Sequence, residues 1–346
     1  MVPRVERSIS AITLLLIAAT GSTFTGTLGF SQSYVYSDHL GVILSQINIP
    51  DHPDLPAQYS MTETVTQAIK LGSKLASIWI KANSPGQIIV AAQSYDYVEI
   101  FNSFQVVELK VCPDYMFTKI NGKYNLDPIY NEYYGLVKEL LKCPSRTFLI
   151  SYFFEMNVYM GTSSSRRPDF PTLDFFQRAQ AGKNQALKEN LNSGVRVYDL
   201  VEINEDSNWQ TFVKKYFPKM KTDLYSLSHY SLTYPITFYF DFMSKYTTSS
   251  PAFGAKNIML GEFGRTVRNT DETAQSNYLA KVIDDAKSWG VPYLFQFWIC
   301  DQPDLNLGTS GAGYGLITTK QDGSLRRQSW HMINTLLQGP SQLRVI

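Results

Sequence analysis

The sequence is poor in the residues that most often hold metals or form cross-links. Its 346 residues include four histidines and three cysteines, Cys112, Cys143 and Cys300. Three cysteines do not make a disulfide framework, although one bridge between Cys112 and Cys143 is compatible with an oxidising compartment. The few histidines weigh against a metal-dependent hydrolase and against a serine or cysteine nucleophile, because both need histidine ligands or a histidine base.

The sequence also lacks an excess of charge of either sign. Its formal net charge is +1, and basic residues gather only in pairs such as Arg166-Arg167. Nucleic-acid binding therefore has no electrostatic support. Aromatic residues make up 14% of the chain, and a neutral, aromatic-rich protein suits an uncharged, hydroxylated ligand such as a sugar. We expect a monomer with a carbohydrate substrate, no cofactor, no bound metal and no nucleic-acid partner.

Long apolar runs are absent except for a short one near the start. Arg4 and Arg7 precede an apolar run over 11–19, and small residues follow at 18–22. The run is about half of the roughly 20 residues that span a bilayer, which predicts a cleaved signal peptide over 1–22 and a secreted protein. A retained signal anchor is the alternative. We expect one domain over 23–346, with no membrane attachment after cleavage.

Short apolar segments alternate with longer amphipathic ones along this domain. Strands are predicted at 41–48, 75–80, 104–111, 147–154, 195–203, 223–229, 257–260 and 293–298. Helices are predicted at 60–72, 127–140, 172–192, 209–216, 235–246, 271–289 and 326–337, and the stretch 81–103 has strand-like pieces at 88–92 and 97–100. Eight strands, seven clearly followed by a helix, favour an α/β fold that closes as a single (β/α)8 TIM barrel.

The rival fold, a doubly wound open sheet, is weakened by two missing motifs. No Gly-x-Gly-x-x-Gly follows the first strand, and no Gly-x-Ser-x-Gly is present. In a (β/α)8 barrel the active site lies at the carboxyl ends of the strands. The polar or aromatic residues predicted there are Asn48, Lys81, Glu108, Lys110, Glu155, Asn157, Glu202, Asn204, Glu205, His229, Tyr230, Glu262, Trp298 and Asp301. Carboxylates dominate this set, and a facing pair of them can cleave a glycosidic bond.

Glu262 is the sharpest catalytic candidate, because it ends an apolar strand between Gly261 and Gly264. Gly261 removes bulk beside the carboxylate, and Gly264 lets the chain turn away. The structural alternative is a glutamate that pairs with Arg265 or Arg268 at the barrel rim.

Glu155 is the second catalytic candidate. It is the first ionisable residue after an almost wholly apolar strand, and Phe153, Phe154 and Met156 surround it. Such surroundings raise the pKa of a carboxyl, as a general acid requires. The alternatives are a glutamate satisfied by a barrel lysine or arginine, and Glu202 as the acid instead.

Other strand-end residues are candidates for binding the substrate or supporting the site. Glu202 and Asn204 face the same side of their strand by alternation, and Glu202 is expected to face the lumen. His229 and Tyr230 could position the nucleophile, or His229 could simply be packed. Trp298 offers a face on which a sugar ring could stack, or belongs to the core.

Together these residues resemble the glycoside hydrolases of the large clan with a (β/α)8 barrel and catalytic glutamates after strands four and seven, the cellulase-like superfamily. Gly-Glu-Phe-Gly at 261–264 looks like the nucleophile motif, Ser-His-Tyr at 228–230 like the helper positions, and Trp298 like the strand-eight tryptophan. Gly-Leu-Ile at 315–317, Asp-Gly-Ser at 322–324 and Trp330 are similar to the ending of many such barrels.

The resemblance implies a retaining mechanism, with Glu262 as nucleophile, Glu155 as acid/base and about 5–5.5 Å between their carboxyl groups. It also carries a departure. The clan usually has an asparagine before the acid/base glutamate, to bind the sugar 2-hydroxyl, and here that position is Phe154. Asn157 or Asn204 could substitute. Two alternatives stay open: a carbohydrate-binding barrel without turnover, and a metal-dependent phosphodiesterase.

Overall fold

A computed structural model describes residues 34–44, 59–191, 193–206, 208–267, 270–301, 313–320 and 322–339. The predicted signal peptide over 1–22 and the strand-end candidate Asn48 lie outside these residues. The chain from Val35 onward forms one compact unit. Within the described residues, none of the helices has the length and apolar character needed to cross a membrane.

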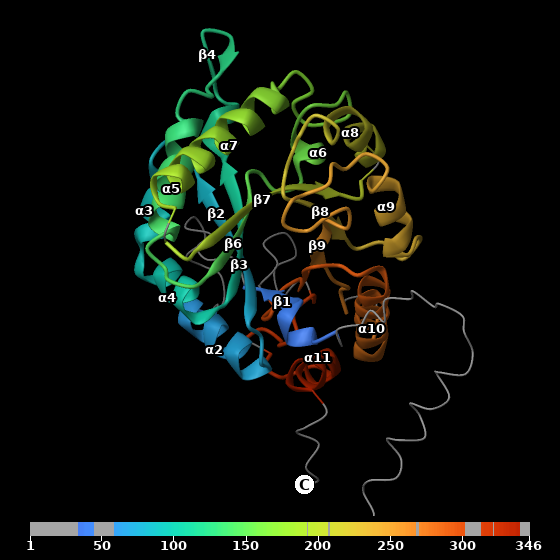
Figure 1. Ribbon diagram of the computed structural model, residues 1–346. Coiled ribbons are helices and arrows are strands. Elements are labelled where there is room, and N and C mark those ends of the chain that lie inside the picture. The colour runs from blue at the N-terminus through green and yellow to red at the C-terminus, as the bar shows by residue number, and fades with distance from the viewer. Residues whose placement is uncertain are drawn as a thin grey trace, which may run out of the picture. The chain divides into compact units, whose positions relative to one another are not determined.

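Eight parallel strands close into a barrel, which confirms the predicted fold class (Figure 1). In chain order they are β1 (Leu40–Ile43), β2 (Leu75–Ala82), β3 (Val106–Pro113), β6 (Thr147–Ser151), β7 (Arg196–Asn204), β8 (Leu224–His229), β9 (Ile258–Phe263) and β10 (Leu294–Gln296). Each strand pairs with its neighbours in chain order, and β10 pairs with β1 to close the ring. A short hairpin, β4 (Lys119–Ile120) and β5 (Lys123–Tyr124), projects between the third and fourth barrel strands.

Helices connect the strands and cover the outside of the barrel (Figure 1). They are α2 (Met61–Leu71), α3 (Gln87–Gln93), α4 (Tyr95–Ser103), α5 (Ile129–Leu140), α6 (Met156–Tyr159), α7 (Thr172–Glu189), α8 (Trp209–Tyr216), α9 (Ile236–Met243), α10 (Glu272–Trp289) and α11 (Gln328–Gln338). The predicted capping box at the start of α2 is confirmed. The Ser60 side chain accepts from the Glu63 backbone N–H, and the Glu63 side chain accepts from the Ser60 backbone N–H.

The stretch before β3 differs from the prediction. The strand-like pieces at 88–92 and 97–100 are parts of helices α3 and α4. Ile88 and Ala92 are buried while Val90 between them is 65% exposed, so the apolar face repeats with the helical period rather than the strand period. The possible disulfide between Cys112 and Cys143 is not formed, because both of these cysteines are free and buried; Cys300 is buried as well.

The barrel interior contains an unusual number of polar groups. Such interiors are commonly filled by branched aliphatic side chains. Here the strands contribute a fully buried set that consists of Ser77, Glu108, Lys110, Ser151, Glu202, Ser226, Ser228 and Gln296. Strands β3 and β7 are separated by β6 in the ring, so the contact between Lys110 on β3 and Glu202 on β7 crosses the lumen. This polar interior bears directly on the residues of the candidate site.

Candidate active site

A pocket with a volume of about 300 Å³ opens beside the carboxyl ends of the strands. Its lining contains the two glutamates that the sequence singled out, Glu155 and Glu262. The other lining residues are aromatic: Trp79, Phe154, Tyr230, Phe297, Trp298 and Tyr314. Glu155 follows the fourth barrel strand and Glu262 lies in the seventh. A hollow with mostly apolar walls and a few polar groups is the usual form of a small-molecule site.

An irregularity in strand β9 presents Glu262 to this pocket. Leu227 and Ser228 are consecutive in β8, yet they pair with Leu260 and Glu262 in β9. One extra residue, Gly261, therefore sits in β9, and the register also shifts against β10. Bulges of this kind re-aim a side chain and are common beside active sites.

The two glycines around Glu262 are required for close packing. A Cβ atom on Gly261 would lie 2.2 Å from the Ser226 hydroxyl oxygen and 3.1 Å from Glu108 Oε1. A Cβ atom on Gly264 would meet Phe297 Cβ at 3.0 Å, and the φ angle of Gly264 is not in the left-handed region. Gly261 thus makes room for Ser226 and Glu108 inside the barrel, whereas the sequence predicted that it removes bulk beside the Glu262 carboxylate. Gly264 lets an aromatic wall of the pocket approach and provides no left-handed turn.

Glu262 has one partner on each carboxylate oxygen. The Tyr230 hydroxyl donates to Oε2, and the Lys110 ammonium lies 3.3 Å from Oε1. Burial raises the pKa of Glu262, the charge of Lys110 opposes this rise, and the charge of Glu202 adds to it. Lys110, a lysine of the barrel interior, is the cation that the described residues place beside Glu262. Of the two arginines considered, Arg268 lies outside the described residues.

Glu155 has different surroundings. Its backbone is left-handed, with φ 46° and ψ 50°, where the chain leaves β6 and enters α6. The Asn204 side-chain amide donates to its Oε1 at 2.6 Å, so among the described residues its donor is an amide and not a lysine or arginine. Burial, and then the nearby charge of Glu262, raise the pKa of Glu155 to about 8. A pKa raised in this way suits a general acid, and its direction is the one predicted from the apolar residues beside Glu155.

Asn157 does not line the pocket. It is fully buried, and its amide is used internally. Its side-chain NH2 donates to the Asn204 carbonyl at 2.9 Å and to the Asn208 side-chain oxygen at 2.8 Å, and its own oxygen accepts from the Asn204 backbone N–H at 2.8 Å. These contacts favour a structural role, in which Asn157 fixes Asn204 so that Asn204 can hold Glu155.

Tyr230 is held by a neighbouring pair, Glu205 and His229. Glu205 accepts from the Tyr230 backbone N–H at 2.7 Å and contacts His229 Nδ1 at 2.6 Å. The His229 ring is buried and lies against the rings of Tyr239 and Tyr278. The alternative of a packed histidine therefore describes His229 better than contact with a substrate does. Tyr230 is the member of this group that reaches the pocket.

Trp298 lines the pocket in an unfavourable backbone conformation. Its φ angle is 63°, and its ring stacks on Phe297 at 4.4 Å with an interplanar angle of 22°. Glu155 and Trp298 are two of the five non-glycine residues with positive φ in the described part of the chain. Strained backbone of this kind concentrates at functional sites, and both residues line one pocket.

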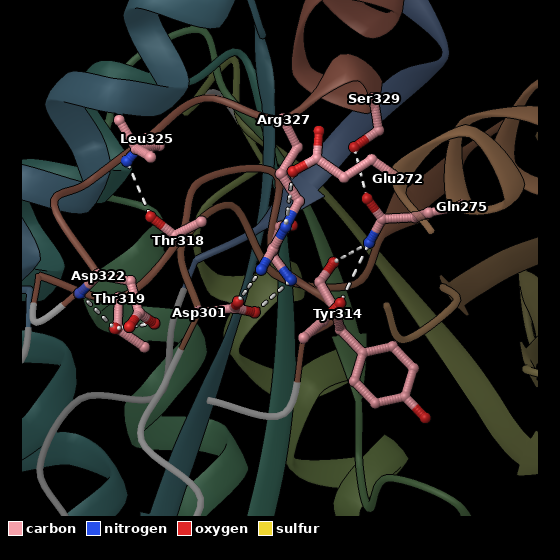
Figure 2. A network of polar contacts seen from close by, with 12 residues as sticks. Glu272, Gln275, Asp301, Tyr314, Thr318, Thr319, Asp322, Leu325, Arg327 and Ser329 are labelled. Carbon is pink, nitrogen blue, oxygen red and sulfur yellow. Dashed lines mark hydrogen bonds and ion pairs between the residues drawn. The ribbon is translucent and has the colours of Figure 1, made fainter. Parts of the chain in front are cut away.

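Three aromatic lining residues were not singled out in the sequence: Trp79, Phe297 and Tyr314. Tyr314 lies in the connection between β10 and α11, far from any predicted strand end, so no periodic signal marks it. The network that holds this connection is shown in Figure 2. Gln275 donates to the backbone oxygens of Gly313 and Tyr314 at 3.2 and 3.4 Å, and Ser329 donates to Gln275 at 2.7 Å.

Asp301, one of the predicted strand-end residues, belongs to the same network. Arg327 donates to Asp301 Oδ2 at 2.6 Å and to the Gly315 carbonyl at 2.5 Å, and Gly315 N–H donates to Asp301 Oδ1 at 2.6 Å (Figure 2). Asp301 is buried within these contacts. It fixes the backbone next to Tyr314 and does not line the pocket.

Within the described residues, no group of three or more histidine, cysteine, aspartate or glutamate side chains could hold a metal ion. The carboxylates beneath the pocket surround Lys110 instead. Lys110 was among the strand-end residues, but its place between three glutamates on different strands was not predictable from spacing along the chain.

Comparisons with known proteins give structural likeness only. No family model and no curated protein sequence matches the chain. Among solved structures, the exo-beta-1,4-mannosidase Op5Man5 from Opitutaceae bacterium strain TAV5 is similar with a TM-score of 0.56 and 11% identity over 87% of this chain and 59% of that one. A family 39 glycoside hydrolase from Bacteroides cellulosilyticus WH2 gives 0.55 and 11%, over 87% and 64%. A beta-mannanase from Streptomyces thermolilacinus gives 0.51 and 12%, over 87% and 91%.

These three solved structures share the fold with this chain. The chain spans about three fifths of the first two and most of the third. At such low identity, the likeness establishes the (β/α)8 barrel that these glycoside hydrolases have in common. Substrate and mechanism must be argued from the site itself.

Proposed function

We propose that this protein is a glycoside hydrolase that cleaves O-glycosidic bonds of an oligo- or polysaccharide with retention of configuration. The observation that carries the proposal is the shared pocket of Glu155 and Glu262. Glu262 is buried and Glu155 is half-buried, and Glu155 accepts from an amide while Glu262 lies beside an ammonium group. Two carboxyls in one site with opposite surroundings divide naturally into an acid and a nucleophile.

In the first step, the protonated Glu155 donates its proton to the leaving glycosidic oxygen as that bond to the anomeric carbon breaks. The Glu262 carboxylate attacks the anomeric carbon and forms a glycosyl ester. In the second step, Glu155 takes a proton from water, the water oxygen attacks the same carbon, and Glu262 leaves as a carboxylate. The Tyr230 hydroxyl keeps Glu262 oriented during both steps.

The pocket walls indicate the class of sugar. Six of the eight lining residues are aromatic, and the other two are the glutamates. Aromatic faces suit the apolar faces of sugar rings, and among the described residues the lining has no lysine or arginine that would pair with a uronic acid carboxylate. We therefore propose a neutral sugar. Neutral β-linked mannosides are the first compounds to test, because structures with this fold include a β-mannosidase and a β-mannanase.

The test is hydrolysis of a panel of neutral aryl glycosides and oligosaccharides, followed by proton NMR of the first-formed anomer. We expect product with the anomeric configuration of the substrate, and loss of turnover in Glu262→Gln and Glu155→Gln. For aryl glycosides with a good leaving group, Glu155→Gln should retain the first step, because little proton donation is needed. First-formed product of inverted configuration would contradict the proposed mechanism.

Phe154 favours a second candidate, a carbohydrate-binding barrel without turnover. The aromatic ring lines the pocket at the position where the resembling clan has an asparagine. Asn157 does not replace that asparagine, because its amide is used internally. This candidate predicts sugar binding by calorimetry that survives Glu262→Gln, with no product from any compound in the panel.

We also propose secretion after removal of residues 1–22. This rests on the basic start and the short apolar run of the sequence. Amino-terminal sequencing of the protein recovered from outside the cell would test it.

A further inference from the structure

Lys110 lies at the centre of a fully buried group of charges below the pocket. Its ammonium contacts Glu202 Oε1, lies 3.3 Å from Glu262 Oε1 and lies 3.7 Å from Glu108 Oε1. The lysine, Glu108 and Glu202 have no exposed side-chain surface. Ser228 adds a hydroxyl that donates to Glu202 at 3.1 Å. One cation thus faces three carboxyl groups from strands β3, β7 and β9.

The charges of this group do not balance if every carboxyl is ionised. One positive charge would face three negative ones, and Glu155 in the pocket above would add a fourth. Uncompensated charge is costly in such an interior, and buried groups take up protons to avoid it. The arrangement therefore requires that at least one glutamate next to Lys110 is neutral.

Glu108 is the neutral member by its contacts. Within the described residues, neither of its oxygens has a partner with hydrogen-bond geometry, although the Ser77 hydroxyl is near enough to lower its pKa, whereas Glu202 and Glu262 each have a donor on one oxygen. Burial raises the pKa of Glu108 to about 8, with Lys110 opposing and Glu202 adding to the rise. Glu202 and Glu262 are then the two carboxylates that share Lys110.

We propose that Lys110 is a positioning residue that keeps Glu262 ionised and correctly oriented as the nucleophile, while Glu202 competes for the same ammonium and Glu108 remains a neutral acid. The inference rests on the proposed glycosidase function and names what separates its two carboxyls. Glu155 and Glu262 line one pocket, and the partial loss of solvent around each carboxyl would by itself favour a proton on each. Lys110 contacts only Glu262 of this pair, so the proton stays on Glu155.

The main charged and titratable groups described around Glu262 all enter this balance. Strand β3 contributes Glu108 and Lys110, strand β7 contributes Glu202, the end of β6 contributes Glu155, and the end of β8 contributes Tyr230. Two of these groups make opposite predictions. Loss of the lysine leaves Glu262 without its cation, while loss of the Glu202 charge leaves the whole ammonium to Glu262.

The experiment is a carbon NMR titration of protein labelled with 13C at the glutamate carboxyl carbons, without any substrate. Signals are assigned with Glu262→Gln, Glu108→Gln and Glu155→Gln. In Lys110→Met we expect the midpoint of Glu262 to rise by about one pH unit or more, as expected for a lost opposite charge within about 4–6 Å. In Glu202→Gln it should fall. At pH 7 the Glu108 signal should be that of a neutral acid.

The matched control is Lys183→Met, which removes the other buried lysine that faces two carboxylates and should leave the Glu262 midpoint unchanged. Lys110→Arg keeps the positive charge, so the Glu262 midpoint should lie close to that of the wild-type protein. An unchanged Glu262 midpoint in Lys110→Met would overturn the inference. If that variant does not fold, an unchanged or raised midpoint in Glu202→Gln overturns it instead. The glycosidase proposal fails separately, by absence of hydrolysis in the wild-type protein.

Discussion

Two buried lysines, each surrounded by carboxylates, lie in different parts of this barrel. Lys183 of α7 contacts Asp199 of β7 at 2.6 Å and Asp223, just before β8, at 3.5 Å. Lys110 of β3 contacts glutamates from β7 and β9 inside the barrel, under the pocket. The first group joins a helix to the outside of the sheet, and the second group faces the candidate active site.

The two groups differ in how completely their oxygens are hydrogen-bonded. Asp199 also accepts from Gln180 at 2.6 Å, and Asp223 accepts from the Asp199 backbone N–H at 3.2 Å. Around Lys110, within the described part of the chain, both oxygens of Glu108 and one oxygen each of Glu202 and Glu262 have no hydrogen-bond partner. Saturated contacts suit a group that holds elements together. Incomplete contacts beside a pocket suit a group that adjusts charge for chemistry.

Lys183→Met is expected to have the largest effect that distinguishes the two groups, a loss of stability without a change in the pH profile. Removing one partner of a buried ion pair leaves uncompensated charge and costs about 3–5 kcal/mol of the free energy of unfolding. Denaturant unfolding would measure this loss. The pH profile of hydrolysis should keep its midpoints, because Lys183 does not contact the pocket. A shifted profile with unchanged stability would contradict the assignment of the two groups.

The pH dependence of stability sharpens the comparison. Glu108 and Glu155 have pKa values raised from 4.5 to about 8. Between these values the unfolded chain has lost those protons while the folded protein keeps them, so unfolding releases protons and the free energy of unfolding falls as pH rises from about 4.5 to about 8.

Glu108→Gln should reduce this slope, because the amide does not titrate. Chemical denaturation across that pH range measures it. Asp223, in the Lys183 group, has a pKa raised to about 7 and contributes a slope of the same sign. Asp223→Asn therefore serves for comparison, because it should also reduce the slope of stability against pH but should not affect the Lys110 group. An identical slope in the wild-type protein and Glu108→Gln would mean that Glu108 is not a neutral acid in the folded protein.

The smallest effect is expected at the pocket wall. Tyr314→Ala removes one aromatic face from the lining, and aromatic contacts contribute about 0.5–1.5 kcal/mol beyond area burial. We expect KM to rise up to about tenfold with little change in kcat. Tyr234→Ala, which removes an exposed tyrosine outside the pocket lining, is the control. Equal effects of the two substitutions on KM would contradict the claim that this pocket binds the substrate.

The strands and most helices could be predicted because each has its own local signal. Ser60 with Glu63, and Asp271 with Gly290, mark helix ends by capping, and the apolar runs mark strands. The prediction of a strand around Ile88 was wrong because a short apolar segment suits a helix and a strand alike. Glu262 could be proposed from the sequence because Gly261, the extra residue of the bulge in β9, directly precedes it.

The rest of the site depends on contacts across the barrel. Lys110 and Glu202 are 92 residues apart, and their meeting follows from closure of the ring rather than from any local pattern. The position of Asn157 near Glu155 in the sequence predicts a sugar-binding residue, but its amide is turned toward Asn204 and Asn208. Proximity along the chain does not distinguish a group that faces the pocket from one that supports it.

The most direct test of the central claim is to trap the glycosyl ester that a retaining mechanism requires. The protein is incubated with an activated 2-deoxy-2-fluoro glycoside of the sugar that the panel identifies, and its intact mass and peptides are measured. We predict a mass increase of one fluoroglycosyl unit, located on the peptide that contains Glu262 and absent in Glu262→Gln. Turnover of the parent glycoside with no adduct, or an adduct on another residue, would contradict Glu262 as the nucleophile.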